Sequence, residues 1–144
     1  MTSRPDTLPL ISFDAFIRSR YSETDQMGYV YYGRYFEFFE QARTEMLRAM
    51  GLPYSHMEAE GVMLPVIRAE IQYHHPIYYD ELMTVRVQVF EEPVSRIRTF
   101  YEVFSERNSD KAAVTGFVEL CFLDRETRRP VRAPEVFLRA VQER

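Results

Sequence analysis

The sequence predicts a single α+β domain in which one long helix covers one face of a curved antiparallel sheet of about five strands. The length of 144 residues fits one domain. The patterns come in the order of an alternating segment, one long apolar stripe with helical spacing, and then four more alternating segments. Residues 13–144 are expected to form this domain, and residues 1–12 a flexible N-terminal arm.

Alternation of apolar and polar residues predicts each strand, because every second side chain of a half-buried strand faces the core. The turns at 91–93 and 108–110 have hairpin length, so the strands that flank them are expected to be antiparallel neighbours. The predicted strands cover residues 13–21, 66–74, 83–90, 97–104 and 112–123.

The clearest helix is predicted over residues 34–50, where apolar side chains recur at spacings of three and four. Gly51 and Pro53 end it. Shorter helices are predicted over 55–59 and 134–144. A single helix about 10 Å wide cannot shield five strands, so apolar and edge surface stays open and the sequence predicts a homo-oligomer.

Composition and charge exclude several functional classes. Hydrophobic residues make up 46% and charged residues 28%, as in an ordinary globular protein, and no segment approaches the roughly 18 apolar residues of a membrane span. The formal net charge of −4 argues against nucleic-acid binding. The single cysteine, Cys121, excludes an internal disulfide, and the adjacent His74 and His75 tend to opposite faces, so no metal site is expected. We expect a cytoplasmic protein.

A carboxylate before the long helix is the best candidate for chemistry, because the sequence has no nucleophile elbow, phosphate-binding loop or dinucleotide-binding turn. Asp25 lies in a glycine-containing loop over residues 22–28. Free N–H groups near Tyr32 and Gly33 would point to the space that Asp25 reaches. Such a pair can activate water or attack an acyl carbon while an oxyanion is stabilised. The alternative is that Asp25 only caps the loop or the helix.

Aromatic residues crowd the segment after this loop, and they too allow two interpretations. Rings at helical spacing usually belong to the core or to a subunit contact, whereas one or two at the helix entrance can line an acyl pocket. Among the helix carboxylates, Glu37 is typical of a solvated charge, and Glu40 is the alternative base to consider because it lies near the apolar stripe. The rings are Tyr29, Tyr31, Tyr32, Tyr35, Phe36, Phe38 and Phe39.

Residues 20–35, RYSETDQMGYVYYGRY, running into EQAR at 40–43, resemble the signature of hot-dog-fold acyl-CoA thioesterases of the 4-hydroxybenzoyl-CoA thioesterase type. Weaker likeness continues through AEIQY at 69–73, the stretch from Pro76 to Leu82, and residues 122–131. The resemblance covers roughly residues 13–138.

This resemblance implies a hot-dog fold, a homodimer that often assembles into a homotetramer, and an active site at the dimer interface. Asp25 stands where the family has its catalytic aspartate, acting as nucleophile or as general base. The backbone N–H of Tyr32 stands where the family polarises the thioester carbonyl. Many bacterial relatives, including the Tol-Pal-associated branch, carry histidine at the position of Tyr32, so the side chain departs from that pattern. Another branch of the family uses a helix glutamate instead of the loop aspartate, and in that case Glu40 or Glu37 would be the base.

Hydrolysis of an acyl-CoA thioester to a free acid and coenzyme A is the activity that the resemblance implies. Coenzyme A is then part of the substrate, and no cofactor is required. The alternatives are an acyl-ACP thioesterase and a non-catalytic acyl-CoA-binding protein. An enoyl-thioester hydratase is disfavoured because no histidine lies in the Asp25 loop. The predicted substrate-binding residues are Gly28, Tyr29 and Tyr35 near the loop and Arg68, Arg96 and Arg98 for the phosphates of the coenzyme.

Overall fold

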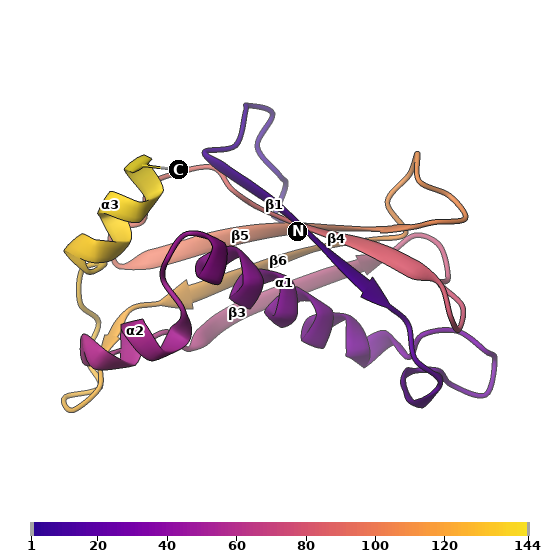
Figure 1. Ribbon diagram of the computed structural model, residues 1–144, viewed down its shortest axis with the longest axis horizontal. Helices are drawn as coiled ribbons and strands as arrows, with labels where there is room; N and C mark the ends of the chain where they lie inside the picture. The colour runs from indigo at the N-terminus through magenta and orange to yellow at the C-terminus, as the bar shows by residue number, and fades with distance from the viewer. Residues whose placement is uncertain (1, 144) are drawn as a thin grey trace.

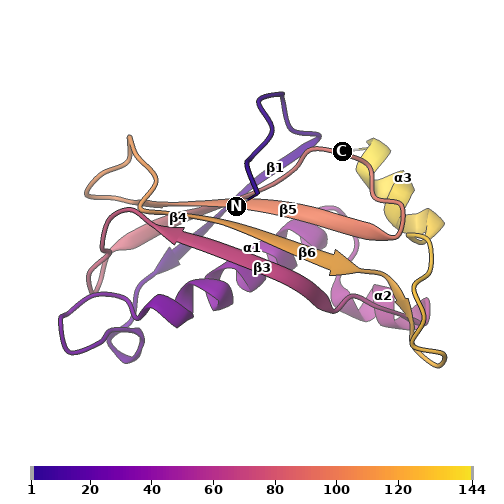
Figure 2. The same cartoon turned by 180° about the vertical axis from the view of Figure 1, so that it is seen from behind.

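A five-stranded antiparallel sheet and one long helix form the core, as the sequence predicts (Figure 1). The computed structural model describes residues 2–143. The strand order is β1-β4-β5-β6-β3, and α1 lies across one face of the sheet in both the front and the back view (Figures 1 and 2). The elements are β1 (Ile11–Arg18), the 3₁₀ turns η1 (Tyr21–Glu23) and η2 (Tyr32–Arg34), α1 (Tyr35–Ala49), α2 (Tyr54–Ala59), β2 (Val62–Met63), β3 (Val66–Tyr73), β4 (Leu82–Val89), β5 (Arg96–Ser105), β6 (Val114–Cys121), β7 (Leu123–Asp124) and α3 (Glu135–Glu143).

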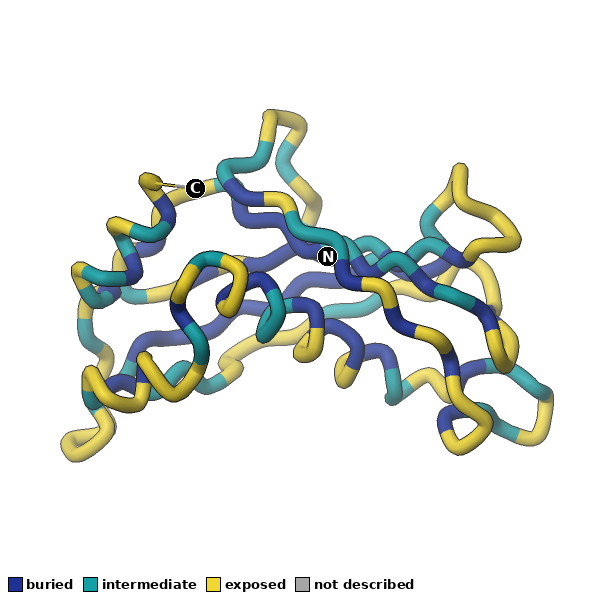
Figure 3. Tube along the Cα trace, viewed as in Figure 1, coloured by how far each residue is buried: buried dark blue, intermediate teal, exposed yellow. Residues whose placement is uncertain are grey.

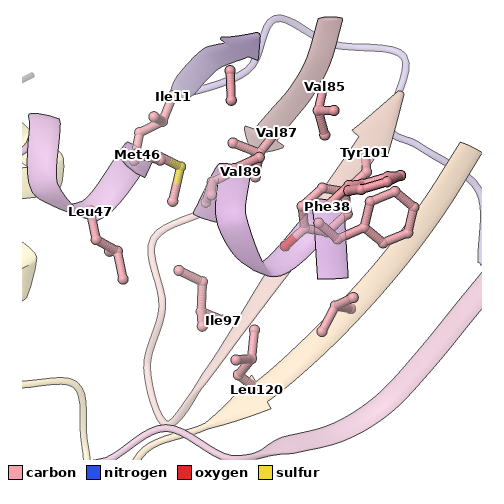
Figure 4. Packing of buried hydrophobic residues seen from close by; sticks show 14 of the residues in the cluster. Ile11, Phe38, Met46, Leu47, Val85, Val87, Val89, Ile97, Tyr101 and Leu120 are labelled. Atoms are coloured by element: carbon pink, nitrogen blue, oxygen red, sulfur yellow. The ribbon is translucent and has the colours of Figure 1, made fainter. Parts of the chain in front are cut away.

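Alternate side chains of the strands form an apolar face that packs on α1, and the outer face mixes polar side chains with the buried pair Phe100 and Phe117. Val85 pairs with Val103 and Val87 pairs with Tyr101 on the helix side, and all four are at most 1% exposed. Phe38 of α1 packs among them (Figure 4). Both hairpin predictions are confirmed, because β5 pairs antiparallel with β4 and with β6.

Gly116 of β6 brings the sheet close to the helix. A Cβ atom at this position would lie 2.3 Å from Cε2 of Phe39, which is closer than atoms can pack. The Phe39 ring is itself stacked on Tyr101 with ring centroids 4.3 Å apart, so it has little room to move aside. Only glycine therefore allows this spacing between α1 and β6.

The first strand is displaced from its predicted bounds. It begins at Ile11, which pairs with Val89, and ends at Arg18, which pairs with Leu82. The predicted range of 13–21 is wrong at its far end because the chain leaves the sheet at Ser19, whose hydroxyl donates to the Tyr78 carbonyl at 2.7 Å. Residues 11 and 12 belong to the strand rather than to the arm.

The predicted strand over 112–123 is shorter and is followed by a small second sheet. The N–H of Phe122 donates to the Ser95 carbonyl at 2.9 Å, outside the main ladder, and β7 then pairs with β2. Two-residue strands carry no readable alternation, so the sequence did not reveal β2 or β7. The C-terminal helix is confirmed as α3, and Arg144 lies outside the described residues.

Residues before β1 cross the outer face of the sheet (Figure 2). The backbone N–H of Thr2 donates to the Glu70 carboxylate at 3.0 Å, and Arg4 Nε donates to Gln88 Oε1 at 2.8 Å. The Arg4 guanidinium also lies 5.6 Å from the centroid of Phe90. The arm is therefore in contact with β3 and β4.

The strand β3 is an edge of the sheet, and much of it is exposed (Figure 3). Val66 and Ile67 are 51% and 47% exposed. Large apolar side chains at an unpaired edge are the surface that the sequence analysis expected to stay open. None of the helices within residues 2–143 is long and apolar enough to span a membrane.

Candidate functional site

The loop that carries Asp25 closes on itself through backbone hydrogen bonds. The N–H of Asp25 donates to the Tyr29 carbonyl at 2.8 Å, and the N–H of Gly28 donates to the Asp25 carbonyl at 3.1 Å. Gly28 has φ of 83°, a conformation that glycine adopts without the steric cost that other residues incur. The predicted turn at Gly28 is confirmed, but Gly28 does not line the cavity described below.

Two neighbouring segments hold this loop in place. The N–H of Tyr31 donates to the Glu23 carbonyl at 2.7 Å, and the N–H of Val30 donates to the Ile77 carbonyl at 2.8 Å. Tyr29 also pairs with Tyr78, and their rings meet edge to face with centroids 5.2 Å apart. The orientation of the loop is thus set by the chain just before β4.

The Asp25 carboxylate has one oxygen engaged and one available. Its Oδ1 accepts the N–H groups of Met27 at 2.9 Å and Tyr29 at 3.3 Å, which is the capping role that the sequence analysis kept as an alternative. Its Oδ2 has no hydrogen-bond partner within residues 2–143. The loop-closing role fixes the carboxylate and leaves one oxygen for a bound molecule.

The first helical turn begins beside this carboxylate and has peptide N–H donors at its start. Tyr31 is extended, with ψ of 135°, and η2 begins at Tyr32 and leads into α1. The first N–H groups of a helix have no acceptor within the helix and lie at its positive end. Those of Tyr32 and Gly33 are therefore suited to hold a developing oxyanion.

One cavity of about 300 Å³ joins Asp25 to this helix entrance. It lies between the Asp25 loop, the start of α1 and the end of β3. Of the predicted site residues, the structure brings Asp25, Tyr29, Tyr32 and Tyr35 together here. The residues that line it are Asp25, Met27, Tyr29, Val30, Tyr32, Tyr35, Tyr73, His74, His75 and Pro76.

The wall from Tyr73 to Pro76 was not predicted. Tyr73 lies 41 residues after Tyr32 in the chain, yet its hydroxyl donates to the Tyr32 carbonyl at 2.8 Å. This contact depends on how β3 is placed in the sheet, and nothing in the local sequence marks it. The two adjacent histidines were considered only as metal ligands, and within the described residues no group of three or more His, Cys, Asp and Glu could hold a metal ion.

Two phenol groups in the cavity wall, those of Tyr35 and Tyr73, keep their protons at neutral pH. Burial raises the pKa of Tyr35, and the nearby Tyr73 and Glu81 raise it further. Burial also raises the pKa of Tyr73, with a further contribution from Tyr32. These hydroxyls are therefore uncharged hydrogen-bond donors across the range in which an enzyme works.

A buried carboxylate, Glu81, supports the segment that holds the loop. It is 3% exposed, and its side chain accepts hydrogen bonds from the Tyr78 N–H and from the Ser105 hydroxyl, the latter at 2.6 Å. Arg107 Nε lies 3.2 Å from the same carboxylate. The Tyr78 N–H donates to Glu81, and Tyr78 pairs with Tyr29 of the Asp25 loop. These two contacts connect the Glu81 network to that loop. Nothing in the local sequence marks Glu81 as part of this support.

The three predicted phosphate-binding arginines lie far from this cavity within one chain. Arg68 precedes Tyr73 by five residues of β3, about 17 Å along a strand. Arg96 and Arg98 lie near Arg68 on the outer face of the sheet. Both form ion pairs with the buried Glu119, Arg96 at 3.7 Å and Arg98 at 2.9 Å. A single protomer therefore does not bring them to Asp25.

The alternative bases also lie elsewhere. Glu37 is exposed and pairs with Arg34 at 3.1 Å. Glu40 lines a separate cavity of about 460 Å³ with Arg43 and Tyr54. Neither carboxylate lines the cavity that Asp25 shares with the helix entrance, so Asp25 is the better candidate in this fold.

Known proteins with similar sequences and structures agree on the family. The family model of the thioesterase-like superfamily matches residues 19–141. The chain is 31% identical over 121 residues to YneP of Bacillus subtilis, provisionally described as an acyl-CoA thioesterase, covering 84% of this chain and 86% of that protein.

Solved structures show the same fold. The DHNA-CoA thioesterase of Staphylococcus aureus superposes with a TM-score of 0.78 at 34% identity, covering 84% of this chain and 80% of that one. The protein TT1821 of Thermus thermophilus superposes with a TM-score of 0.82 at 31% identity, covering 91% and 98%. The predictions of a hot-dog fold and of a thioesterase are thus confirmed at the level of the family, and the chain belongs to the thioesterase-like superfamily.

Proposed function

We propose that the protein hydrolyses acyl-CoA thioesters to a free carboxylic acid and coenzyme A, with Asp25 as the reacting carboxylate. The observation that carries the proposal is the single cavity that holds both Asp25 and the helix entrance at Tyr32. A thioesterase needs these two elements: a group that activates or delivers a nucleophile, and donors for the oxyanion. Membership of the family and the coenzyme A thioester in the name of the Staphylococcus aureus relative support this substrate class.

Two routes use the same atoms. In the first, Oδ2 of Asp25 takes a proton from water as the water oxygen attacks the thioester carbon. The carbonyl oxygen becomes an oxyanion beside the N–H groups of Tyr32 and Gly33. Its collapse breaks the C–S bond, and the thiolate of coenzyme A takes up the proton. In the second, the carboxylate itself attacks the thioester carbon, the C–S bond breaks and coenzyme A leaves as a thiolate, so that an anhydride with Asp25 forms. Water then hydrolyses the anhydride to the free acid and the Asp25 carboxylate, and the proton released passes to the thiolate. No cofactor takes part in either route.

The proposal includes a homodimer that pairs through the exposed edge of β3. If two copies of β3 pair antiparallel about a two-fold axis, the Tyr73 end of each strand lies next to the Arg68 end of the other. Arg68 of the partner subunit would then approach the Asp25 cavity, and the arginines that one chain keeps remote would become available for the phosphates of coenzyme A. A homotetramer and a cytoplasmic location stay predictions.

The dimer is tested by light scattering on the purified protein. A mass of two or four chains is expected, and a monomer at all concentrations would contradict the proposal. Ile67→Lys introduces a charge at the exposed edge and is expected to shift the mass toward the monomer. Val94→Lys, at an exposed apolar position in the turn between β4 and β5, is the control and should leave the mass unchanged.

The activity is tested by thiol detection with a panel of short, long and aromatic acyl-CoA esters. Release of coenzyme A from at least one class of ester is expected. Release only from acyl groups carried on acyl carrier protein would replace coenzyme A as the substrate carrier. Tight binding of the esters without any release would show a non-catalytic binding protein and overturn the proposed function.

A further inference from the structure

The side chain of Tyr35 is buried, but its hydroxyl is not fully enclosed. Tyr35 is 2% exposed, and its ring is held edge to face by Phe38 and Tyr73, each with centroids 5.7 Å away. Within residues 2–143 its hydroxyl makes no hydrogen bond. Once a bound molecule excludes water from it, such a hydroxyl destabilises the complex unless it gains a hydrogen bond.

Other buried phenols of the core are satisfied. The Tyr101 hydroxyl accepts from Arg43 Nη1 at 2.9 Å and is 2.8 Å from the Thr99 hydroxyl. The half-buried Tyr73 donates to the Tyr32 carbonyl. The chain thus provides partners for the neighbouring phenols, and Tyr35 is the exception among these three.

Tyr35 lines the cavity that contains Asp25. Every fully enclosed polar side-chain atom in the described residues has a hydrogen-bond partner. An oxygen without one must therefore reach open space, and the cavity that Tyr35 lines is the one shared with Asp25. Because burial keeps its pKa above the usual value, the group there is a neutral O–H that can donate.

The position of Tyr35 relative to the helix entrance indicates what it would meet. Tyr35 follows Tyr32 by three residues, so it lies about 5 Å further along the helix than the N–H proposed to hold the thioester carbonyl. A substituent of the acyl group that lies beside Tyr35 would therefore be only a few bonds from the acyl carbon. The walls around it are the rings of Tyr29, Tyr32 and Tyr73, which offer mostly apolar surface.

We propose that the Tyr35 hydroxyl donates a hydrogen bond to an oxygen substituent on the acyl group, and that it selects such acyl groups over plain hydrocarbon ones of the same size. This inference rests on the proposed function and names the specificity residue of that site. A site that has a buried donor loses binding energy when the substrate has no acceptor, because the donor then stays unpaired.

The test compares matched esters in the wild type and in Tyr35→Phe. The pairs are 3-hydroxybutyryl-CoA with butyryl-CoA, and the ring-hydroxylated benzoyl-CoA esters with benzoyl-CoA. In the wild type, kcat/KM is expected to favour the hydroxylated member of at least one pair by about ten-fold. In Tyr35→Phe this ratio should fall to near one, because kcat/KM for the hydroxylated ester falls more than kcat/KM for the plain one.

The control is Tyr79→Phe, which makes the same chemical change at a 52% exposed tyrosine outside the cavity and should keep the wild-type ratio. An equal loss for both members of each pair in Tyr35→Phe would indicate a purely structural role and overturn the inference, as would a wild type without preference.

Dissociation constants of the same esters, measured by calorimetry, keep the two proposals separate. If no ester is hydrolysed, the proposed hydrolysis fails. The ratio of dissociation constants within each pair, and its loss in Tyr35→Phe, then decides the role of Tyr35 on its own.

Discussion

Asp25→Asn is expected to lower kcat for thioester hydrolysis by a factor of about 10²–10⁴, the range that a positioned acid or base contributes. The amide cannot take a proton from water or attack the acyl carbon. Its oxygen can still accept the N–H groups of Met27 and Tyr29, so the loop should keep its shape. Thiol release measures the activity, and urea unfolding should show a free energy close to that of the wild type.

Two further variants make this result decisive. Asp110→Asn makes the same change at an exposed acid in the β5–β6 turn and should retain wild-type activity. Glu40→Gln tests the carboxylate in the separate cavity. Near-normal turnover in Asp25→Asn, together with a large loss in Glu40→Gln, would move the reacting carboxylate to α1.

Glu81→Leu is expected to lower the free energy of unfolding by about 3 kcal/mol, because it leaves one buried and one partly buried donor without their acceptor. These are the N–H of Tyr78 and the hydroxyl of Ser105. The substitution also releases Arg107 from its ion pair, which contributes little because that side chain is 67% exposed. Urea unfolding measures the change, provided that the slope with denaturant stays constant.

Glu92→Leu is the matched control for Glu81→Leu, since Glu92 is exposed in the β4–β5 turn and should tolerate the change within about 0.5 kcal/mol. Glu81→Gln should lie between the two, because one amide oxygen can still accept from Tyr78. A loss below 1 kcal/mol in Glu81→Leu would contradict the view that this carboxylate supports the chain that holds the Asp25 loop.

The main elements could be predicted because burial on one side leaves a periodic trace in the sequence. Alternation marks the half-buried strands, and the stripe that includes Phe39 and Met46 marks α1. The ends of elements left no such trace. Strand β1 ends where the Ser19 side chain finds an acceptor in Tyr78, 59 residues away, and no local pattern reports that contact.

The candidate site was predictable in one half only. Asp25, Gly28 and the helix start at Tyr32 lie within eight residues of each other, so a local motif contains them. The opposite wall comes from the end of β3, and the support from Glu81 comes from the segment before β4. Both are brought in by the sheet order, which joins residues 40 to 60 positions apart. The arginines at the other end of β3 depend on a second chain for any part in the site.

The absence of a side chain at Gly116 has a bearing on any attempt to broaden the range of acyl groups. Phe39 rests against this position, and the same helix carries Tyr35 one turn toward its N-terminus. A larger residue at position 116 would push α1 away from the sheet and would also move Tyr35, which lines the pocket. Substitutions confined to the lining residues would therefore leave out Gly116, a position on the opposite strand that helps to set where Tyr35 lies.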